Sequence, residues 1–578
     1  MSAVKPPSLS SGSEDDEVHK FVDNDGNPVD VKAAEVPADL APPRLEPFRL
    51  TDIFFRRDKL KPLDPNAIAT QVSVYDDPVL SKHYWPSAKY ENLHRFDISA
   101  RWTWKEERAL VRKIDWRVMM WAAVAFSALN LDRNNLSQAN TDNFLPDLHM
   151  TTNDFNWGNS VFRIAFLCAE LPSQLVSKRL GPDRWIPIQM CAWSVVTMCQ
   201  FWLTGRTTFL VTRALLGFIQ GGFIPDFILW MSYFYTKNEL PLRLAGFWAS
   251  SNACSIIASF IAFGVLHMRG VAGRAGWRWL FLIEGFITLI LGIIGFFMMP
   301  PSPTQTKKWY RPNGWFTERE EIIAVNRILR DDPSKGDMHN REALSVKRLF
   351  KAALDYDLYP LYIIGLMFGI PITPPGQYLT LGLRSLGFST FKVNLLTIPS
   401  TVAATITLFG VTILSELFDN RSYVSMLEDI WALPFLVALY CLPKHPNPWV
   451  YFGLASGLLS YPYTHAIQVA WCSRNAGAVA SRTVNASLYN MFVQASSVIA
   501  SQIYRADDAP RYRRGNKVLI IITVFNLVIM YPGTKAYYKW RNRQRDRIWN
   551  AMTSEEKSHY LTTTTDVGNR RLDFRFAH

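Results

Sequence analysis

The sequence predicts an all-α membrane protein whose twelve transmembrane helices form two six-helix pseudo-repeats. Hydrophobic residues make up 49% of the 578-residue chain and are concentrated in long runs between charged ends. Each run has about the 20 residues that a helix needs to cross a bilayer. A charged stretch at 301–356 divides these runs into two sets of six, as expected for an internal repeat.

The N-terminal region, 1–112, is rich in proline, serine and acidic residues. Its few apolar residues cannot form a core, so we expect a largely disordered cytoplasmic tail. It lacks the features of a cleaved signal peptide, so the first spanning helix must direct insertion. Five basic residues around the start of that helix favour the cytoplasmic side: Lys105, Arg108, Arg112, Lys113 and Arg117.

The N-terminal half, 113–300, contains the first six expected spans. They are 116–140, 155–176, 185–203, 209–235, 244–266 and 279–299. The loop 141–154 carries aspartates and no lysine or arginine, as expected outside the cell. Lys178 and Arg179 follow the second span, which returns the chain to the cytoplasm.

The linker, 301–356, is predicted to be cytoplasmic, with a helical pattern at 317–330. The C-terminal half, 357–540, repeats the plan. Its expected spans are 358–381, 391–414, 424–442, 449–471, 486–503 and 518–538. The loop 505–517 is basic although it should lie outside the cell. The preference of basic residues for the cytoplasmic side is a statistical bias, and single loops can depart from it. The tail, 541–578, is expected in the cytoplasm.

Composition limits the function classes. The net charge of +13 is attributed to basic residues that flank helices, and no nucleic-acid platform is expected. The six cysteines lie mostly in apolar runs without metal-ligand spacing, so they are expected to pack in the core. The sequence has no phosphate-binding loop and no hydrolytic triad pattern, so we expect neither an enzyme nor a cofactor.

Two matched strings resemble the gating motif of the major facilitator superfamily. The stretch 174–181 keeps Arg179 and Gly181 but has Lys178 where an aspartate is usual. The stretch 415–421 keeps an acid, Glu416, at that position, and it ends on Arg421. A copy in each half is what an internal repeat predicts.

Further strings resemble the anion:cation symporter family, in its fungal allantoate permease-like branch. They are Asp132-Arg133-Asn134-Asn135, Glu170-Leu171-Pro172-Ser173, Gly276-Trp277-Arg278-Trp279-Leu280-Phe281 and Asp508-Ala509-Pro510-Arg511-Tyr512. The resemblance covers 116–538. It implies uptake of small organic anions, such as ureides, vitamins or related carboxylates, together with protons. We expect a monomer in the lipid bilayer of the plasma membrane, with both termini cytoplasmic.

Near the end of the first span, Arg133 has the planar donor fork that suits a carboxylate. The resemblance also places the substrate anion here, although Arg133 could instead pair with Asp132. Asp132 is the predicted proton carrier, because an anion arriving at its neighbour would change its protonation.

The fourth span carries Arg213 and, two turns later on the same face, Gln220. The family commonly has an acid at the position of Gln220, and glutamine cannot carry a proton. Either Asp132 or Glu170 then acts alone, or transport is not obligatorily proton-coupled. Asp226 should point away from Gln220 on helical phase, and the nearby glycines are expected to serve close packing.

Two other acids have competing interpretations. Glu170 shares a face with Arg163, so the pair could form a charge network, or Glu170 could fix helix packing. Glu284 is expected to bond to Arg278 or to a partner at the cytoplasmic face.

In the second half, Gln377 and Tyr378 follow a run of helix-breaking residues in the seventh span. Broken helices expose backbone groups to substrates, so this segment is a candidate for the substrate wall. Asn490 and Gln494 share a helix face and could bond either to substrate or to another helix.

We therefore expect a secondary transporter that imports a small organic anion by alternating access, with the proton coupling that the resemblance implies. Arg133 and Arg213 would hold the anion, and Gln377, Tyr378, Asn490 and Gln494 would form the opposite wall. Two alternatives stay open: an exporter of a metabolite made by the cell, and a nutrient sensor that does not transport.

Overall fold

The computed structural model describes most of the chain from residue 64 onward. The described residues are 21–22, 28–29, 40, 64–76, 81, 85–88, 90–236, 239–333, 335–336, 354–418, 420–443, 446–475, 479–553, 556–557, 559–560, 564, 568–572 and 574–578. Before residue 64 they include two short paired strands, β1 (Phe21–Val22) and β2 (Pro28–Val29). The expectation for the rest of 1–63 lies outside the described residues.

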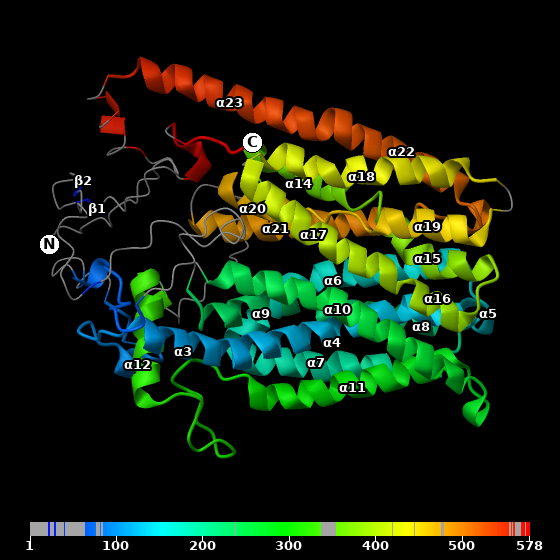
Figure 1. Ribbon diagram of the computed structural model, residues 1–578, viewed down its shortest axis with the longest axis horizontal. Coiled ribbons are helices and arrows are strands. Elements are labelled where there is room, and N and C mark those ends of the chain that lie inside the picture. Colours follow the sequence, from blue (N-terminus) through cyan, green and yellow to red (C-terminus); the bar gives the residue numbers. More distant parts are fainter. Residues whose placement is uncertain are drawn as a thin grey trace.

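Two helical halves lie side by side with their helices nearly parallel (Figure 1). The first half comprises α3 (Trp104–Ile114), α4 (Met120–Ala139), α5 (Phe144–Asp147), α6 (Thr152–Leu180), α7 (Pro182–Cys199), α8 (Arg206–Gln220), α9 (Phe223–Ser232), α10 (Leu240–Val265) and α11 (Gly276–Met298). The second comprises α14 (Tyr359–Phe368), α15 (Thr373–Ser385), α16 (Thr390–Leu396), α17 (Ile398–Phe418), α18 (Arg421–Cys441), α19 (Pro448–Leu459), α20 (His465–Asn475), α21 (Val479–Ala500), α22 (Arg513–Phe525) and α23 (Tyr531–Ala551).

These helices make up the twelve expected spans, six in each half, and the fold class is confirmed. Several spans consist of two helices in sequence. The fourth is broken between α8 and α9 at Gly221 and Gly222, and the seventh between α14 and α15 at 369–372, within the expected breaker run. Two π-helical turns, Asp115–Met119 and Asn526–Met530, join α3 to α4 and α22 to α23.

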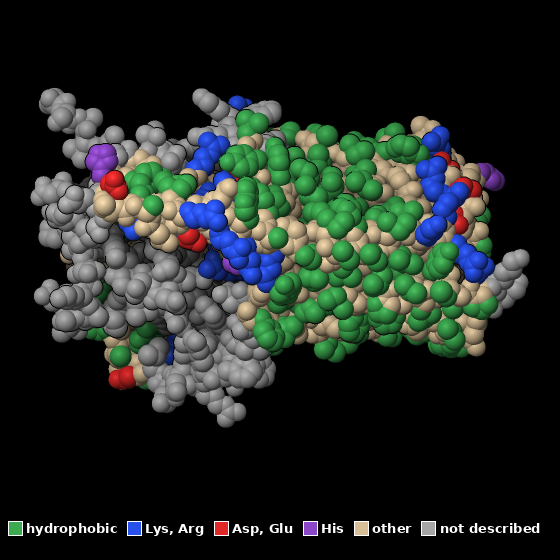
Figure 2. All heavy atoms as spheres, turned by 90° about the horizontal axis from the view of Figure 1, so that it is seen from above, with side chains coloured by type: hydrophobic (Ala, Val, Ile, Leu, Met, Phe, Trp, Pro, Cys, Tyr) green, Lys and Arg blue, Asp and Glu red, His purple; other side chains and the backbone are tan. Residues whose placement is uncertain are grey.

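On the face shown in Figure 2, hydrophobic side chains cover the bundle in a broad belt, and basic side chains border the belt at both ends. Seven of the described helices or helix pairs are long and apolar enough to cross a membrane by length and composition alone. Large hydrophobic side chains remain exposed along the belt, including Ile406, Phe409, Ile430, Ile521 and Val528. Such a surface is stable in lipid and not in water.

Local sequence explains where the long helices begin and end. The side chain of Thr151 accepts a hydrogen bond from the backbone N–H of Asp154, and the side chain of Asp154 accepts one from the backbone N–H of Thr151. This capping box starts α6. Gly181 ends α6 with a φ of 86°, a conformation that favours glycine. The kept glycine of the gating motif therefore makes the turn from α6 into α7.

Described residues of the segment 64–103 pack against the linker helix α12 (Glu318–Asp331), which lies across one end of the first half (Figure 1). The guanidinium of Arg330 donates to both carboxylate oxygens of Asp76, at 2.7 and 2.9 Å. Tyr75 and Tyr90 are buried against the apolar face of α12. This segment was expected to belong to a disordered tail; in the structure it has specific partners on the linker, so the disorder expectation does not extend to it.

The last residues of the chain fold back onto the second half. Trp471 Nε1 donates to the carbonyl of Ala577 at 2.8 Å, and Asn475 bonds both polar backbone atoms of Ala577. Phe576 is 2% exposed and stacks on Tyr538 at 5.0 Å between centroids. The C-terminal segment thus joins α20 to α23.

The halves touch closely at the end of the bundle opposite α12, called the distal end here; the end at α12 is the linker end. At the distal end, Asn156 of α6 donates to the carbonyl of Tyr504. Nearby, Thr390 donates to the carbonyl of Thr141 at 2.9 Å. Deeper in the bundle, Ser160 and Ser501 are bonded at 2.8 Å. These bonds hold the distal end closed in this structure.

Candidate anion-binding site

Three arginines from three helices surround one phenyl ring in the first half. The guanidinium carbons of Arg133 (α4), Arg163 (α6) and Arg213 (α8) lie 5.8, 5.7 and 4.5 Å from the centroid of Phe162. Arg133 also lies 5.1 Å from the ring of Phe166. An aromatic face attracts a cation, so the two rings supply part of the stabilisation that water would give outside.

Glycine packing brings two of these helices together. A Cβ on Gly217 would lie 2.2 Å from the carbonyl oxygen of Phe162, so α8 lies directly against α6 at this level. The expectation that Gly217 serves close packing is confirmed. The same approach places Arg213, one turn earlier on α8, over the ring of Phe162.

The arginines have no carboxylate partner among the residues that the structure describes. Arg133 Nε donates to Gln220 Oε1 at 3.1 Å, and Arg163 Nη1 donates to Gln494 Oε1 at 2.8 Å; both acceptors are neutral amides. Among the side chains of Arg133, Arg213 and Gln220, four buried nitrogens have no acceptor in the structure. They are Arg133 Nη2, Arg213 Nε, Arg213 Nη1 and Gln220 Nε2. Buried donors without acceptors are costly, and an anion is one ligand that can satisfy these donors.

The bond from Arg163 to Gln494 brings the second half into the site. Gln494 lies on α21, one turn after Asn490, whose side chain faces His465 of α20. The ring of His465 packs against Tyr463 at 5.6 Å and Trp248 at 6.5 Å. Tyr463 is 36% exposed and Trp248 37%, although both lie at this contact between the halves. We call His465, Tyr463 and Trp248 the aromatic wall. The rings of Tyr463 and Trp248 are therefore only partly covered by other residues of the protein.

Tyr378 occupies a different position from the arginines. Its hydroxyl donates to Asn156 Oδ1 at 2.5 Å, and its ring packs against Tyr504 and Tyr512. Asn156 precedes Arg163 by seven residues, about two helical turns or ~10 Å. The structure thus places Tyr378 at the distal end, about two helical turns from the arginines, in the contact that closes that end. Gln377 has a buried Oε1 without a hydrogen-bond partner.

Asp132 and Arg133 are adjacent in sequence but face different neighbours. Arg133 faces α6 and α8, whereas Asp132 is 1% exposed and faces Trp193 and Thr197 of α7 and Thr288 of α11. Glu284 of α11 is fully buried near Asp132 and Asn135. The expectation that Glu284 bonds to Arg278 was wrong, because the guanidinium of Arg278 instead donates to the carbonyls of Phe201 and Leu203.

Glu170 does not meet Arg163. Its charged neighbour is Asp226 of α9, which also faces Ser177. The helical-phase argument for Asp226 assumed a continuous helix, but Gly221 and Gly222 interrupt it, with Gly222 at a φ of 82°. Asp226 faces α6, and its expected orientation away from Gln220 stays a prediction. The Gly-Gly pair was the available sequence signal for this break.

The gating strings lie at the linker end. Arg179 is exposed at the end of α6, and Arg421 begins α18. The side chains of Lys178 and Glu416 lie outside the described part of the structure.

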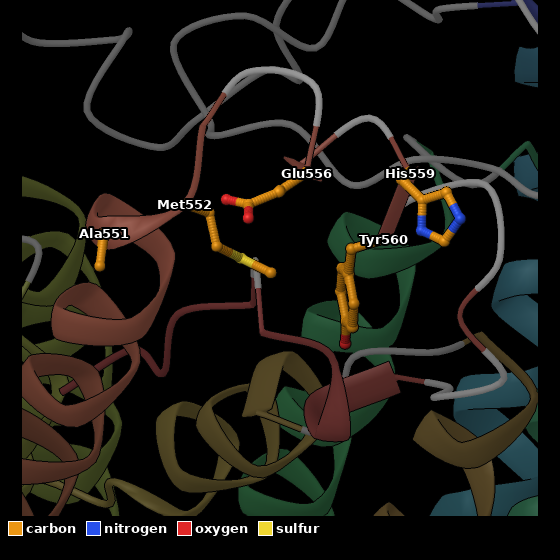
Figure 3. A pocket seen from close by; sticks show the side chains of 5 residues that line it. All are labelled: Ala551, Met552, Glu556, His559 and Tyr560. Atoms are coloured by element: carbon orange, nitrogen blue, oxygen red, sulfur yellow. The ribbon is translucent and has the colours of Figure 1, made fainter.

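A pocket of about 390 Å³ lies beyond the apolar part of the bundle, at the end of α23 (Figure 3). It is lined by Ala551, Met552, Glu556, His559 and Tyr560. All five residues belong to the C-terminal region, so this pocket is separate from the arginines and from the contact between the halves.

Sequence reasoning missed two members of the site. Arg163 was assigned to a network with Glu170, and His465 was not singled out. Their signals were weak, because the partners of Arg163 and His465 come from other spans.

Comparisons with known proteins agree with this architecture. The model of the family described as Major Facilitator Superfamily matches residues 120–501. The chain is 46% identical over 496 residues to the uncharacterized transporter YIL166C of Saccharomyces cerevisiae, covering 86% of this chain and 91% of that protein. It is 26% identical to the MFS-type transporter efuF of Hormonema carpetanum, over 76% of this chain and 86% of that one.

Two solved structures show the same fold at low sequence identity. A bacterial homolog of the human lysosomal transporter Spinster, in an inward-facing and unoccupied conformation, superposes with a TM-score of 0.56 at 14% identity, covering 73% of this chain and 97% of that one. A D-xylose-proton symporter gives 0.54 at 13% identity, covering 72% and 99%.

Proposed function

The chain belongs to the major facilitator superfamily and is a multi-pass membrane transporter, and from this premise we propose that it imports a small organic anion, a ureide, vitamin or related carboxylate, by proton symport. The proposal concerns the substrate class, the coupling ion and the direction.

The cluster of Arg133, Arg163 and Arg213 around Phe162 carries the proposal. Each guanidinium is permanently charged and presents donors in the geometry of a carboxylate. The buried donors of Arg133 and Arg213 without acceptors support an anionic ligand. Substrate sites of this fold lie near the midplane between the two halves, and the bond from Arg163 to Gln494 spans that boundary.

Buried carboxyls support proton coupling. Gln220 cannot titrate, but Asp132 on α4 and Glu170 on α6 lie on the helices that supply Arg133 and Arg163. A carboxyl inside a membrane protein is expensive unless it has a function, and proton relay is a common one. Asp132 remains the first candidate, acting through α4 rather than through a side-chain contact with Arg133.

The direction rests on the arrangement of the ends. Basic residues before the first span favour a cytoplasmic linker end. With the distal end closed by Tyr378, Asn156 and Tyr504, the arginines would communicate with the cytoplasm in this state. Alternating access would then break these distal bonds and close the linker end.

The test is uptake into proteoliposomes that contain the purified protein. Labelled allantoate, pantothenate, nicotinate and related acids would be supplied with and without an inward pH gradient. We expect gradient-dependent accumulation of at least one acid, and no accumulation by Arg133→Ala. Failure of every one of these acids to accumulate, with or without the gradient, would overturn the proposal of organic-anion import.

The two alternatives have distinct outcomes. An exporter would deplete preloaded acid from cells while failing to accumulate it from outside. A sensor would bind an acid without moving it in either direction.

A further inference from the structure

The number of positive charges at the site limits the charge of the substrate. We propose that the transported anion carries two negative charges, on separate acidic groups held by Arg133 with Arg213 and by Arg163. This inference rests on the proposed organic-anion function and adds a substrate class to it.

The first argument is charge balance. Arginine stays protonated in proteins, so the site holds three positive charges. A monoanion would leave two of them uncompensated inside a low-dielectric bundle, where repulsion between like charges is strong. A dianion leaves one, which the faces of Phe162 and Phe166 partly stabilise.

The second argument excludes the protein's own acids in the described part of the chain as counter-charges. Asp132 faces α7 and α11, and Glu284 lies on α11 close to Asp132, on the side of α4 away from the arginines. Glu170 has Asp226 as its charged neighbour. Every ion pair among the described residues lies elsewhere, and none includes Arg133, Arg163 or Arg213.

The third argument is the division of the donors into two groups. The first group lies on α4 and α8 and consists of Arg133, Arg213 and Gln220. Its side chains carry the four buried nitrogens without an acceptor that are described above. Arg163 points instead toward the second half, where a neutral amide oxygen of Gln494 is its acceptor. A carboxylate could take the place of that amide oxygen. Because all three guanidiniums lie within 6 Å of one ring, a small molecule can span both groups.

The aromatic wall suits the body of such a molecule. His465, Tyr463 and Trp248 present ring faces next to Gln494 and Asn490, and Tyr463 and Trp248 are partly exposed. A flat substrate could stack there while its acidic groups reach the arginines.

The test compares matched acids that differ by one charge. The probes are benzene-1,3-dicarboxylate with its monoamide 3-carbamoylbenzoate, and butanedioate with its monoamide. Binding to the purified full-length protein would be measured by calorimetry at pH 7.5, where every free carboxyl is ionised. We expect at least one dianion to bind tenfold or more tightly than its monoamide.

Variants identify the residue that reads the second charge. In Arg163→Gln the preference for the dianion should fall to less than threefold, and in Arg163→Lys, which keeps the charge, it should stay above threefold. Lys392→Gln, at an exposed position on α16, removes a charge elsewhere and should leave the preference unchanged.

The outcomes distinguish failure of the dianion inference from failure of the organic-anion proposal on which it rests. Equal affinity for both members of each pair that binds would overturn the dianion inference and leave the organic-anion proposal standing. A preference that survives Arg163→Gln would overturn the role of Arg163. Failure of all four acids to bind, together with failure of the uptake screen, would overturn both proposals.

Discussion

Arg133 Nε donates to Gln220 Oε1 at 3.1 Å, and this bond joins the first and fourth spans at the centre of the arginine cluster. A glutamine orients the guanidinium without neutralising it. An acid at the same place would pair with Arg133 and compete with an incoming anion. The neutral side chain therefore leaves the full charge for the substrate.

The first prediction is that Gln220→Glu weakens anion binding at neutral pH, raising the apparent KM about tenfold by pairing with Arg133. Lowering the external pH should reverse the effect, because a protonated glutamic acid no longer pairs with the arginine. The measurement is initial uptake rate against substrate concentration at several pH values. Gln220→Met, which loses the hydrogen bond without adding charge, is the control. A KM in Gln220→Glu equal to that of the wild type would show that Arg133 does not hold the anion.

The second prediction concerns the donor fork. Arg133→Lys keeps the charge and removes the paired donors, so uptake should fall about tenfold to a hundredfold with normal surface expression. Arg213→Ala should act mainly through a higher KM. Lys392→Gln serves as the surface control. Uptake by Arg133→Lys at the wild-type rate would rule out bidentate recognition.

The third prediction addresses coupling. Asp132→Asn fixes the side chain in a neutral form, so accumulation driven by a pH gradient should be lost. Exchange of internal for external substrate requires no net proton release and should persist. Uptake against external pH and counterflow would be measured in parallel. An unchanged pH profile with full accumulation would move the proton to Glu170 or indicate a uniporter.

The fourth prediction tests how the linker helix is held. Arg327 of α12 is 4% exposed in its side chain and donates to both carboxylate oxygens of Glu239, at 2.7 and 2.9 Å. Arg327→Gln should destabilise the protein by about 2–4 kcal/mol, because Glu239 loses its buried partner. Arg319→Gln, in a far more exposed pair with Glu106, should cost less than about 1 kcal/mol. Thermal unfolding in detergent gives the comparison, and equal losses would contradict it.

Acidification should act on the same contact. Burial works to raise the pKa of the Glu239 carboxyl, but Arg327 and Arg243 outweigh it and hold that pKa below its ordinary value. The contribution of Glu239 to stability is therefore present at neutral pH and lost as pH falls through the lowered pKa. In Arg327→Gln this loss should begin at a higher pH.

The fifth prediction revises the extent of the dispensable tail. From its composition alone, a tail that cannot form a core should be dispensable, which predicts that residues before about Glu91 are unnecessary for transport. Because Asp76 and Tyr75 bind α12, we now expect that only deletion of 1–63 leaves uptake intact. Deletion of 1–90 should lower thermal stability and surface expression. Full stability of the longer deletion would show that these contacts contribute nothing.

The spans could be predicted from sequence because each needs only an apolar run of bilayer length. The breaks inside them were harder to place. Pro371 and the prolines after it predicted the break in the seventh span. Gly221 and Gly222, by contrast, lie in an otherwise continuous apolar run, so the break in the fourth span was not predicted. Because the helix is interrupted there, helical phase cannot be carried from Gln220 to Asp226.

The candidate site could be predicted only in part. Arg133 and Arg213 were identifiable as charges within apolar helices. The pairing of Arg163 with Gln494 joins residues 331 positions apart, and a single sequence carries no signal for such a contact. The separation of Asp132 from Arg133 likewise depends on which helices pack against each face of α4.

The docked C-terminus has a practical consequence for handling this protein. Ala577 and Phe576 are enclosed by Trp471, Asn475 and Tyr538, so a purification tag or fluorescent reporter fused directly to His578 would press against that enclosure. Removal of the last five residues would bare the aromatic surface of Trp471 and Tyr538 and offer quality-control factors a misfolding signal. A reporter at the N-terminus avoids both problems.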